Sequence, residues 1–147
     1  MKLGKTTKFI IDAVVYIVIV VGIVVGLPKF LSWSLKTPFP MAAITSGSMW
    51  PQLKQGDMVF IQGEQTKDTI SAGDVVVWRS EQGPGFVIHR VTELKENTFI
   101  TKGDANFTSD PPVKYEQLVG KALTWRGKMV KLPYLGSVTT YASQFAQ

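Results

Sequence analysis

Four side chains in this 147-residue sequence could together perform nucleophilic catalysis. Ser48 follows a glycine, and His89 is the only histidine. Asp104 and Asp110 are carboxylates a little further along the chain. A serine hydroxyl becomes a nucleophile when a neighbouring base takes its proton, and histidine suits that task because its ordinary pKa is about 6.5. A carboxylate on the far ring nitrogen would orient the base. The side chains lie in or beside three segments, 45–51, 87–91 and 101–106.

Each segment on its own also has an ordinary structural explanation. Ser-Gly-Ser occurs in many turns, and a histidine between Ile88 and Arg90 could simply be packed on a strand. Gly103 and Asp104 could form a turn closed by the aspartate side chain. The combination and order of the segments favour chemistry over these alternatives.

Composition excludes several other kinds of site. The chain has no cysteine, so disulfides, thiolate metal sites and a cysteine nucleophile are impossible. A single histidine rules out a multi-histidine metal site, and we expect no metal and no cofactor. The net charge of +5 is modest, and no basic block interleaved with aromatics predicts nucleic-acid binding.

The elements that must position these residues begin with an apolar run between Phe9 and Leu27. Such a run, as a helix of about 1.5 Å rise per residue, matches the hydrocarbon thickness of a bilayer. Pro28 and Lys29 are expected to close it. The run is longer than a signal-peptide core and has no small-residue cleavage site after it, which favours a retained anchor. Lysines before the run place the N-terminus in the cytoplasm.

The rest of the chain is typical of a mainly β fold. Short stretches rich in Val, Ile, Phe and Thr are separated by Gly, Pro, Asp and Asn. We expect small curled antiparallel sheets or a barrel after the anchor, loops at 64–72 and 80–84, and no further helix. The expected strands are 58–61, 74–78, 85–91, 98–102, 120–125 and 128–132. The expected division is a cytoplasmic N-terminus at 1–8, a transmembrane anchor at 9–28, a juxtamembrane linker at 29–40, an extracytoplasmic β domain at 41–136 and a tail at 137–147.

The motifs, taken in order, resemble the signal peptidase I family. Ser-Gly-Ser-Met-x-Pro is followed by Gly-Asp, then by Ile-His-Arg-Val, and then by Thr-Lys-Gly-Asp-x-Asn. The resemblance runs from the anchor to about Leu135. The better-known bacterial branch has a lysine base where this chain has His89. The chain therefore resembles the branch of the endoplasmic reticulum, archaea and some Gram-positive bacteria.

The resemblance implies roles for individual residues. Ser48 would be the acylating nucleophile and His89 the general base. Asp110 is the favoured partner of His89, with Asp104 in a supporting role and as the alternative partner. The Ser48 N–H and the Ser46 hydroxyl would form the oxyanion hole.

The implied substrate is a preprotein whose signal peptide lies in the bilayer beside the anchor. Its extended segment would add as a strand to a sheet edge. The protein would act at the cell membrane as a single-pass protein with its catalytic domain outside, next to the lipid bilayer and the protein-export translocon. The residues expected to bind the substrate are Met41, Ala43, Ile44, Thr45, Val87 and Ile88.

Three alternatives differ from this interpretation. The chain could be a non-catalytic, membrane-anchored assembly factor with a degenerate peptidase fold. A self-cleaving peptidase of the repressor type shares a related β fold and a Ser/Lys pair, but would need a DNA-binding domain or a soluble N-terminus instead of the apolar run. A specialised processing peptidase with few clients would use the same chemistry.

Overall fold

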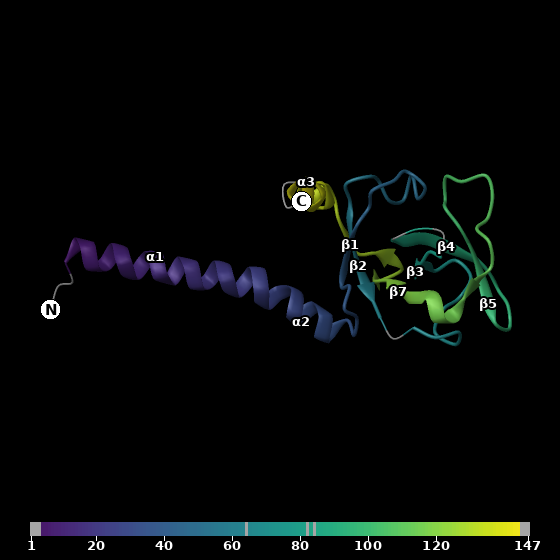
Figure 1. Ribbon diagram of the computed structural model, residues 1–147, viewed down its shortest axis with the longest axis horizontal. Coiled ribbons are helices and arrows are strands. Elements are labelled where there is room, and N and C mark those ends of the chain that lie inside the picture. The colour runs from purple at the N-terminus through teal and green to yellow at the C-terminus, as the bar shows by residue number, and fades with distance from the viewer. Residues whose placement is uncertain (1–3, 64, 82, 84, 145–147) are drawn as a thin grey trace.

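The computed structural model describes residues 4–63, 65–81, 83 and 85–144. The expectations for residues 1–3, 64, 82, 84 and 145–147 fall outside these described residues. A long N-terminal helix extends away from a β domain (Figure 1). The mainly β fold that the sequence predicts is confirmed, with a curled antiparallel sheet.

The N-terminal helix is built from three consecutive pieces: α1 (Lys5–Val21), a π-helical turn (Gly22–Gly26) and α2 (Leu27–Ser34). Together, Lys5–Ser34 is long and apolar enough to cross a membrane. The helix continues past Pro28 to Ser34, so residues 29–34, which the sequence assigned to a linker, are helical. The bounds of the membrane anchor itself stay a prediction. Proline cannot donate the helical hydrogen bond to the carbonyl four residues back, and the wider turn just before it accommodates this.

The main sheet has eight strands, and all of its pairings are antiparallel. Its order is β1-β2-β7-β3-β4-β5-β6, with β10 also paired to β2. Register shifts in the β3–β7 and β4–β5 pairs act as bulges, which increase the twist and help the sheet to curl. The strands are β1 (Met41–Ala43), β2 (Met58–Gln62), β3 (Val75–Arg79), β4 (Phe86–Leu94), β5 (Thr98–Lys102), β6 (Val113–Lys114), β7 (Leu118–Ala122) and β10 (Lys131–Leu132), with a 3₁₀ turn at Tyr115–Gln117.

Strand β3 explains why the core has two parts. Successive side chains of a strand point to opposite faces. Val75 accordingly packs in one apolar cluster, while Val76 and Trp78 pack in the other. A strand buried on both faces requires the continuous apolar run Val75–Trp78. The first cluster lies beneath the segment that carries Ser48, because it includes Ile44, Met49, Leu53, Val59, Val75 and Ala122.

The two strands predicted after residue 119 are each divided. Leu118–Ala122 stays in the main sheet, while β8 (Thr124–Trp125) pairs with β9 (Lys128–Met129) in a separate hairpin. Arg126 and Gly127 join these strands with φ values of 50° and 76°. Two central residues with positive φ make the tight turn that suits the twist of a hairpin.

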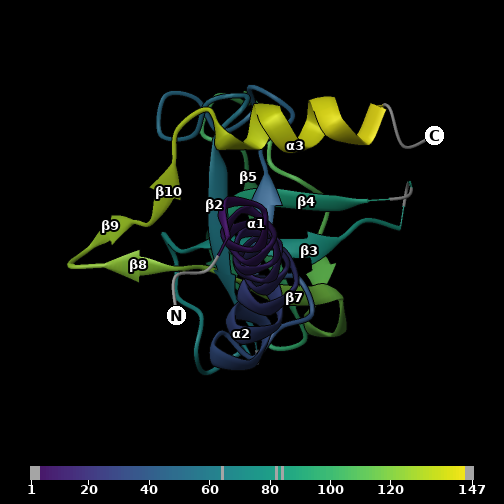
Figure 2. The same cartoon turned by 90° about the vertical axis from the view of Figure 1, so that its left-hand side faces the viewer.

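The expectation that no helix follows the anchor is wrong, because α3 spans Leu135–Gln144. Its start is fixed by close packing. A Cβ on Gly136 would lie 2.4 Å from the Asp57 carbonyl oxygen, so only glycine fits there. Figure 2, which looks along α1, shows α3 lengthwise, on one side of the sheet. This contact with the fold, rather than a strong helical pattern, specifies the helix.

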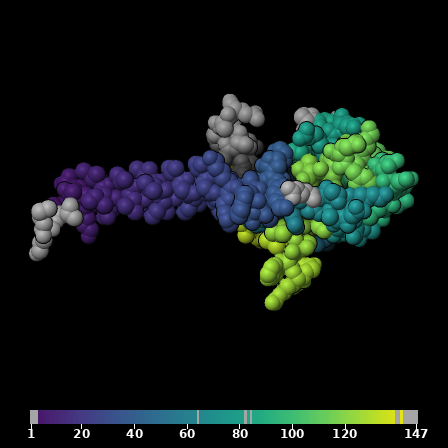
Figure 3. Space-filling view, turned by 90° about the horizontal axis from the view of Figure 1, so that it is seen from below, coloured from purple at the N-terminus to yellow at the C-terminus, as the bar shows by residue number. Residues whose placement is uncertain are grey.

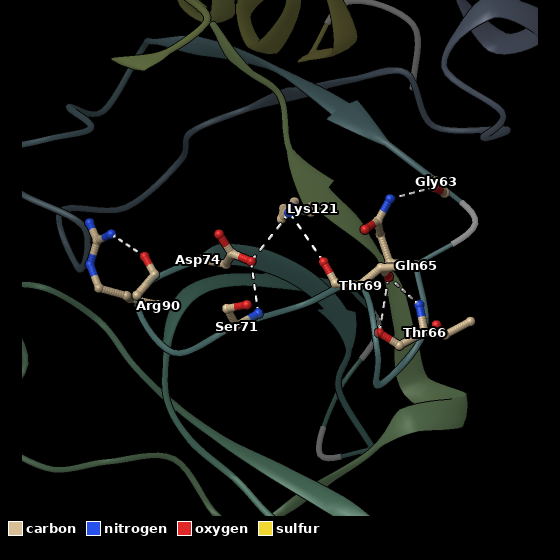
Figure 4. A network of polar contacts seen from close by, with 9 residues as sticks. Gly63, Gln65, Thr66, Thr69, Ser71, Asp74, Arg90 and Lys121 are labelled. Carbon is tan, nitrogen blue, oxygen red and sulfur yellow. Dashed lines mark hydrogen bonds and ion pairs between the residues drawn. The ribbon is translucent and has the colours of Figure 1, made fainter. Parts of the chain in front are cut away.

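A polar network closes the long connection between β2 and β3 (Figure 4). The Asp74 carboxylate accepts hydrogen bonds from the Ser71 N–H at 2.9 Å and from Lys121 Nζ at 3.3 Å. Lys121 Nζ also donates to the Thr69 carbonyl at 3.2 Å. Because Lys121 belongs to β7, this connection is tied to the centre of the sheet.

Candidate active site

Ser48 lies on a loop that is closed at both ends and held from below. The Ile44 N–H donates to the Asp57 carbonyl, and the Gly56 N–H donates to the Ile44 carbonyl, each at 2.8 Å. Met49 and Leu53 are buried in the core beneath the loop. Because Met49 directly after it points into the core, Ser48 is itself half-buried.

His89 approaches Ser48 from strand β4. The distance between His89 Nε2 and Ser48 Oγ is 3.1 Å, within hydrogen-bonding range. His89 pairs with Val76 on β3 and is only 8% exposed. The two residues are 41 positions apart in the sequence, so the sheet is what brings them together.

Asp110 contacts the other side of the His89 ring. Its Oδ2 lies 2.6 Å from His89 Nδ1. The same oxygen accepts a hydrogen bond from the Thr101 hydroxyl at 2.6 Å, and the Asp110 N–H donates to the Thr101 carbonyl at 2.8 Å. Thr101 is completely buried. The sequence did not single out Thr101. The only signal for it is that Thr101, with its short hydroxyl side chain, begins the third segment next to Lys102.

Asp104 lies elsewhere, in a bidentate ion pair with Arg90. Arg90 Nε and Nη2 donate to its two carboxylate oxygens at 2.8 and 2.7 Å. These hydrogen bonds raise the pKa of Arg90 above its usual value. Arg90 also donates to the Gly73 carbonyl at 2.7 Å and to the side chain of Gln52, four residues after Ser48. The Arg90–Asp104 pair therefore joins the second and third segments to the loop of the first.

The third segment also touches the nucleophile loop through its backbone. The Ala105 N–H donates to the Ser48 carbonyl at 2.8 Å. A Cβ on Gly103 would lie 2.6 Å from that carbonyl oxygen and 2.8 Å from Asn106 Nδ2. Because real Cβ atoms do not approach so closely, glycine is required for this contact.

The two groups predicted for an oxyanion hole are the Ser46 hydroxyl and the Ser48 N–H. The Ser46 hydroxyl is 3.2 Å from Ser48 Oγ. Within the part of the chain that the structure describes, the Ser48 N–H has no backbone or side-chain acceptor. The Ser48 N–H is thus available to a substrate oxygen, whereas the Ser46 hydroxyl is within hydrogen-bonding distance of Ser48 Oγ.

A cavity of about 310 Å³ opens beside Ser48 and His89. Five of the six predicted substrate-binding residues line it. The sixth, Met41, lines a neighbouring cavity of about 280 Å³ that shares Ala43, Phe86 and Ile88 with the first. The lining of the first cavity comprises Ala43, Ile44, Thr45, Ser46, Ser48, Met49, Phe86, Val87, Ile88, His89 and Asn106.

Two strand edges beside this cavity lack a partner strand among the described residues. Strand β1 pairs with β2 alone. The first half of β4 pairs with β3, whereas β5 pairs only with the part of β4 from Arg90 onward. An extended peptide lying between β1 and Phe86–Ile88 could therefore form backbone hydrogen bonds with both.

No group of three or more His, Asp or Glu side chains able to hold a metal ion occurs in the described ranges.

Comparisons with known proteins bear on this site. No protein-family model matches the chain. The catalytic subunits of the signal peptidase complexes of Homo sapiens and Canis lupus familiaris are each 33% identical over 119 residues, which are 72% of this chain and 58% of each relative. The corresponding subunit of Fusarium vanettenii is 26% identical over 128 residues, 79% of this chain and 71% of the relative.

The chain is a homologue of signal peptidase catalytic subunits. It spans a little over half the length of the mammalian signal peptidase subunits it matches. Each of these relatives is named as a catalytic subunit of a signal peptidase complex. This relationship agrees with the order of motifs that runs through Ser48, His89 and the two acids.

Proposed function

We propose that this protein is a signal peptidase I of the Ser-His-Asp branch, which removes signal peptides from secreted or membrane preproteins. The observation that carries the proposal is the contact chain Ser48 Oγ–His89 Nε2–Asp110 Oδ2, with distances of 3.1 and 2.6 Å, beside a cavity with two open strand edges. A non-catalytic assembly factor is not favoured, since it has no need of a serine and histidine in contact.

The proposed reaction begins with attack of Ser48 Oγ on the scissile carbonyl carbon. His89 Nε2 takes the hydroxyl proton, and Asp110 stabilises the imidazolium that forms. The carbonyl oxygen becomes an oxyanion held by the Ser48 N–H and the Ser46 hydroxyl. When the C–N bond breaks, His89 returns the proton to the leaving amine. Water, activated by the same histidine, then hydrolyses the acyl-enzyme and releases Ser48.

The substrate would bind as an extended strand between β1 and the first half of β4. Alternate side chains of such a strand point the same way. Two substrate side chains that are two positions apart would therefore both contact the wall that the two cavities share. That wall is formed by Ala43, Phe86 and Ile88. Phe86 lines both cavities, of about 310 and 280 Å³, and we expect small side chains at both positions.

The proposed topology is a single span with the N-terminus in the cytoplasm. Residues 9–28 would cross the cell membrane, and residues 41–136 would form the catalytic domain on the outer face. The Lys5–Ser34 helix and the lysines at its start support this arrangement. The signal peptide would lie in the bilayer next to this helix, and the protein-export translocon is the proposed neighbour that delivers it.

Cleavage of a preprotein by the reconstituted protein tests the proposal. Mass spectrometry of the products should find one cut, after the signal peptide, with small residues at the first and third positions before it. Ser48→Ala should abolish the cut, whereas Ser71→Ala, an exposed serine outside the site, should leave it unchanged. Cleavage within the mature part, or equal cleavage by Ser48→Ala, would contradict the proposed function.

A further inference from the structure

Charge is distributed unevenly along the β domain. All 11 acidic residues precede residue 117, whereas the segment from 117 onward contains three lysines and one arginine. Lys121 and Lys131 pair with Asp74 and Asp57 in the body of the domain. The other two cations, Arg126 and Lys128, are exposed on the β8–β9 hairpin.

The same segment exposes large apolar side chains. Trp125, next to Arg126 on the hairpin, is 70% exposed. On α3, Leu135, Val138 and Tyr141 are 42, 63 and 65% exposed. Residues three apart share one face of a helix. Gly136, which packs against the domain, lies on the other face of α3.

Both features lie where the domain meets the anchor. Along the direction of α1, α3 is level with α2 and nearer to α1 than any labelled strand (Figure 1). The β8–β9 hairpin projects from the body at the same level (Figure 3). In Figure 1, α3 is seen end-on, and in Figure 2 it is seen lengthwise, so its axis is roughly perpendicular to α1.

The α2 helix marks the depth of the membrane surface. The apolar run ends at Leu27, and the exposed aromatics Phe30 and Trp33 follow it. Aromatic side chains gather at the membrane–water boundary. A helix perpendicular to the anchor at this level lies flat in that boundary, as interfacial amphipathic helices do.

We infer that the β8–β9 hairpin and the outer face of α3 form a docking surface for the headgroup region of an anionic lipid bilayer. The inference rests on the proposed membrane anchorage. Leu135, Val138, Tyr141 and Trp125 enter the boundary of the acyl chains, and Arg126 and Lys128 meet lipid phosphates. A second copy of this chain is a poorer partner, because the segment offers no acids to pair with these cations. Docking at two points beside the anchor fixes the tilt of the domain over the membrane.

Site-directed spin labelling tests this directly, since the chain has no native cysteine to remove. Three single-cysteine versions of the full chain are reconstituted in phosphatidylcholine vesicles with and without phosphatidylglycerol: Thr124→Cys, Val138→Cys and Phe107→Cys. Phe107 is the matched control, because it is 99% exposed in the loop after β5. That loop lies at the end of the domain away from α1 (Figure 1). Each nitroxide is probed with oxygen, which concentrates in lipid, and with a water-soluble nickel chelate.

Labels at positions 124 and 138 should collide more with oxygen than with nickel, and the label at 107 should show the reverse. Combining Arg126→Glu with Lys128→Glu should weaken docking on the order of tenfold in phosphatidylglycerol vesicles. Nickel access at 124 and 138 equal to that at 107 would overturn the inference. Oxygen access at positions 124 and 138 that charge reversal leaves unchanged would also overturn it. So would a nickel access at these positions that falls in lipid-free detergent as the protein concentration rises, because that would indicate contact with a second copy of the chain. Co-flotation of the chain with vesicles checks the proposed membrane anchorage separately. The spin-label measurement does not depend on peptidase activity.

Discussion

Asp110 and His89 meet at 2.6 Å, on the side of the imidazole ring away from Ser48. The Thr101 hydroxyl and the backbone of the same residue hold the Asp110 carboxylate in that position. Asp104, which the sequence offers as an alternative, has both of its oxygens engaged by Arg90. The geometry therefore separates an acid that touches the proposed base from an acid that ties segments together.

This separation predicts different effects for the two acids. Asp110→Asn should lower kcat on the order of 10³–10⁴-fold, because the amide cannot stabilise an imidazolium and favours the wrong tautomer. Asp104→Asn should lower the free energy of unfolding by about 1 kcal/mol, because it weakens the partly exposed ion pair with Arg90. Its loss in kcat should be far smaller than that of Asp110→Asn. Preprotein cleavage kinetics and thermal unfolding of both variants measure this. A larger kcat loss in Asp104→Asn would assign the roles the other way round.

Thr101 should act as a positioning residue. Thr101→Val keeps the shape of the side chain but removes the donor to Asp110, so the carboxylate can turn away from His89. We expect kcat to fall about tenfold, the cost of roughly one hydrogen bond, with KM unchanged. Thr101→Ser restores the hydroxyl and should recover most of the activity. If Val and Ser variants lose kcat equally, the hydroxyl is not what matters.

Gly103 should tolerate no side chain. In Gly103→Ala the new Cβ would meet the Ser48 carbonyl oxygen and force the third segment away from the nucleophile loop. We expect a loss of about 1–3 kcal/mol in stability and a fall in kcat, since Asp110 follows on the same connection. Gly83→Ala is the matched control, because nothing lies within 4 Å of its added Cβ. Equal thermal stability of the two variants would contradict the close approach.

The buried carboxylate Asp57 predicts a pH dependence of stability. Burial raises its pKa, but hydrogen bonds from Lys131 Nζ at 2.8 Å and from the Lys54 N–H at 3.1 Å outweigh burial, so the pKa lies below its ordinary value. A carboxylate with a lowered pKa in the folded state stabilises the fold above its unfolded pKa of about 4 and loses this effect as the pH falls through the folded value.

The unfolding temperatures of the wild type and Asp57→Asn should therefore differ most near neutral pH. The gap should close as the pH falls below about 4. Asp68→Asn, at an exposed carboxylate, serves as the control for a general charge effect. A gap between wild type and Asp57→Asn that stays constant down to acidic pH would show that the Lys131 contact does not depend on the charge.

Local patterns made much of the fold predictable. The strand Thr98–Lys102 has the predicted bounds, because its β-branched and aromatic residues stand between clear turn signals. The strand Val113–Lys114 was missed, since two residues carry no pattern and pair only because Thr98 and Phe99 lie opposite. Helix α3 was missed because contact at Gly136, rather than periodicity, specifies it.

The candidate site shows the same limit. The motifs pointed to Ser48, His89 and two acids and favoured Asp110 as the partner of the histidine, but the sequence left Asp104 open as the alternative. That choice depends on how the connection after β5 folds back onto Thr101. Gln52 helps to hold the Ser48 loop, because Arg90 donates to its side chain and Lys131 donates to its carbonyl. These partners are 38 and 79 residues away in the sequence, so the contacts leave no local pattern.

The central claim is that Ser48 and His89 work as one catalytic unit. The most direct test is a double-mutant cycle on preprotein cleavage with Ser48→Ala, His89→Ala and the double variant, all shown to be folded. Residues that act as a unit are strongly non-additive, so each single variant should lose about as much kcat as the double variant, by four or more orders of magnitude. Near-normal turnover in either single variant, or losses that multiply in the double variant, would contradict the account.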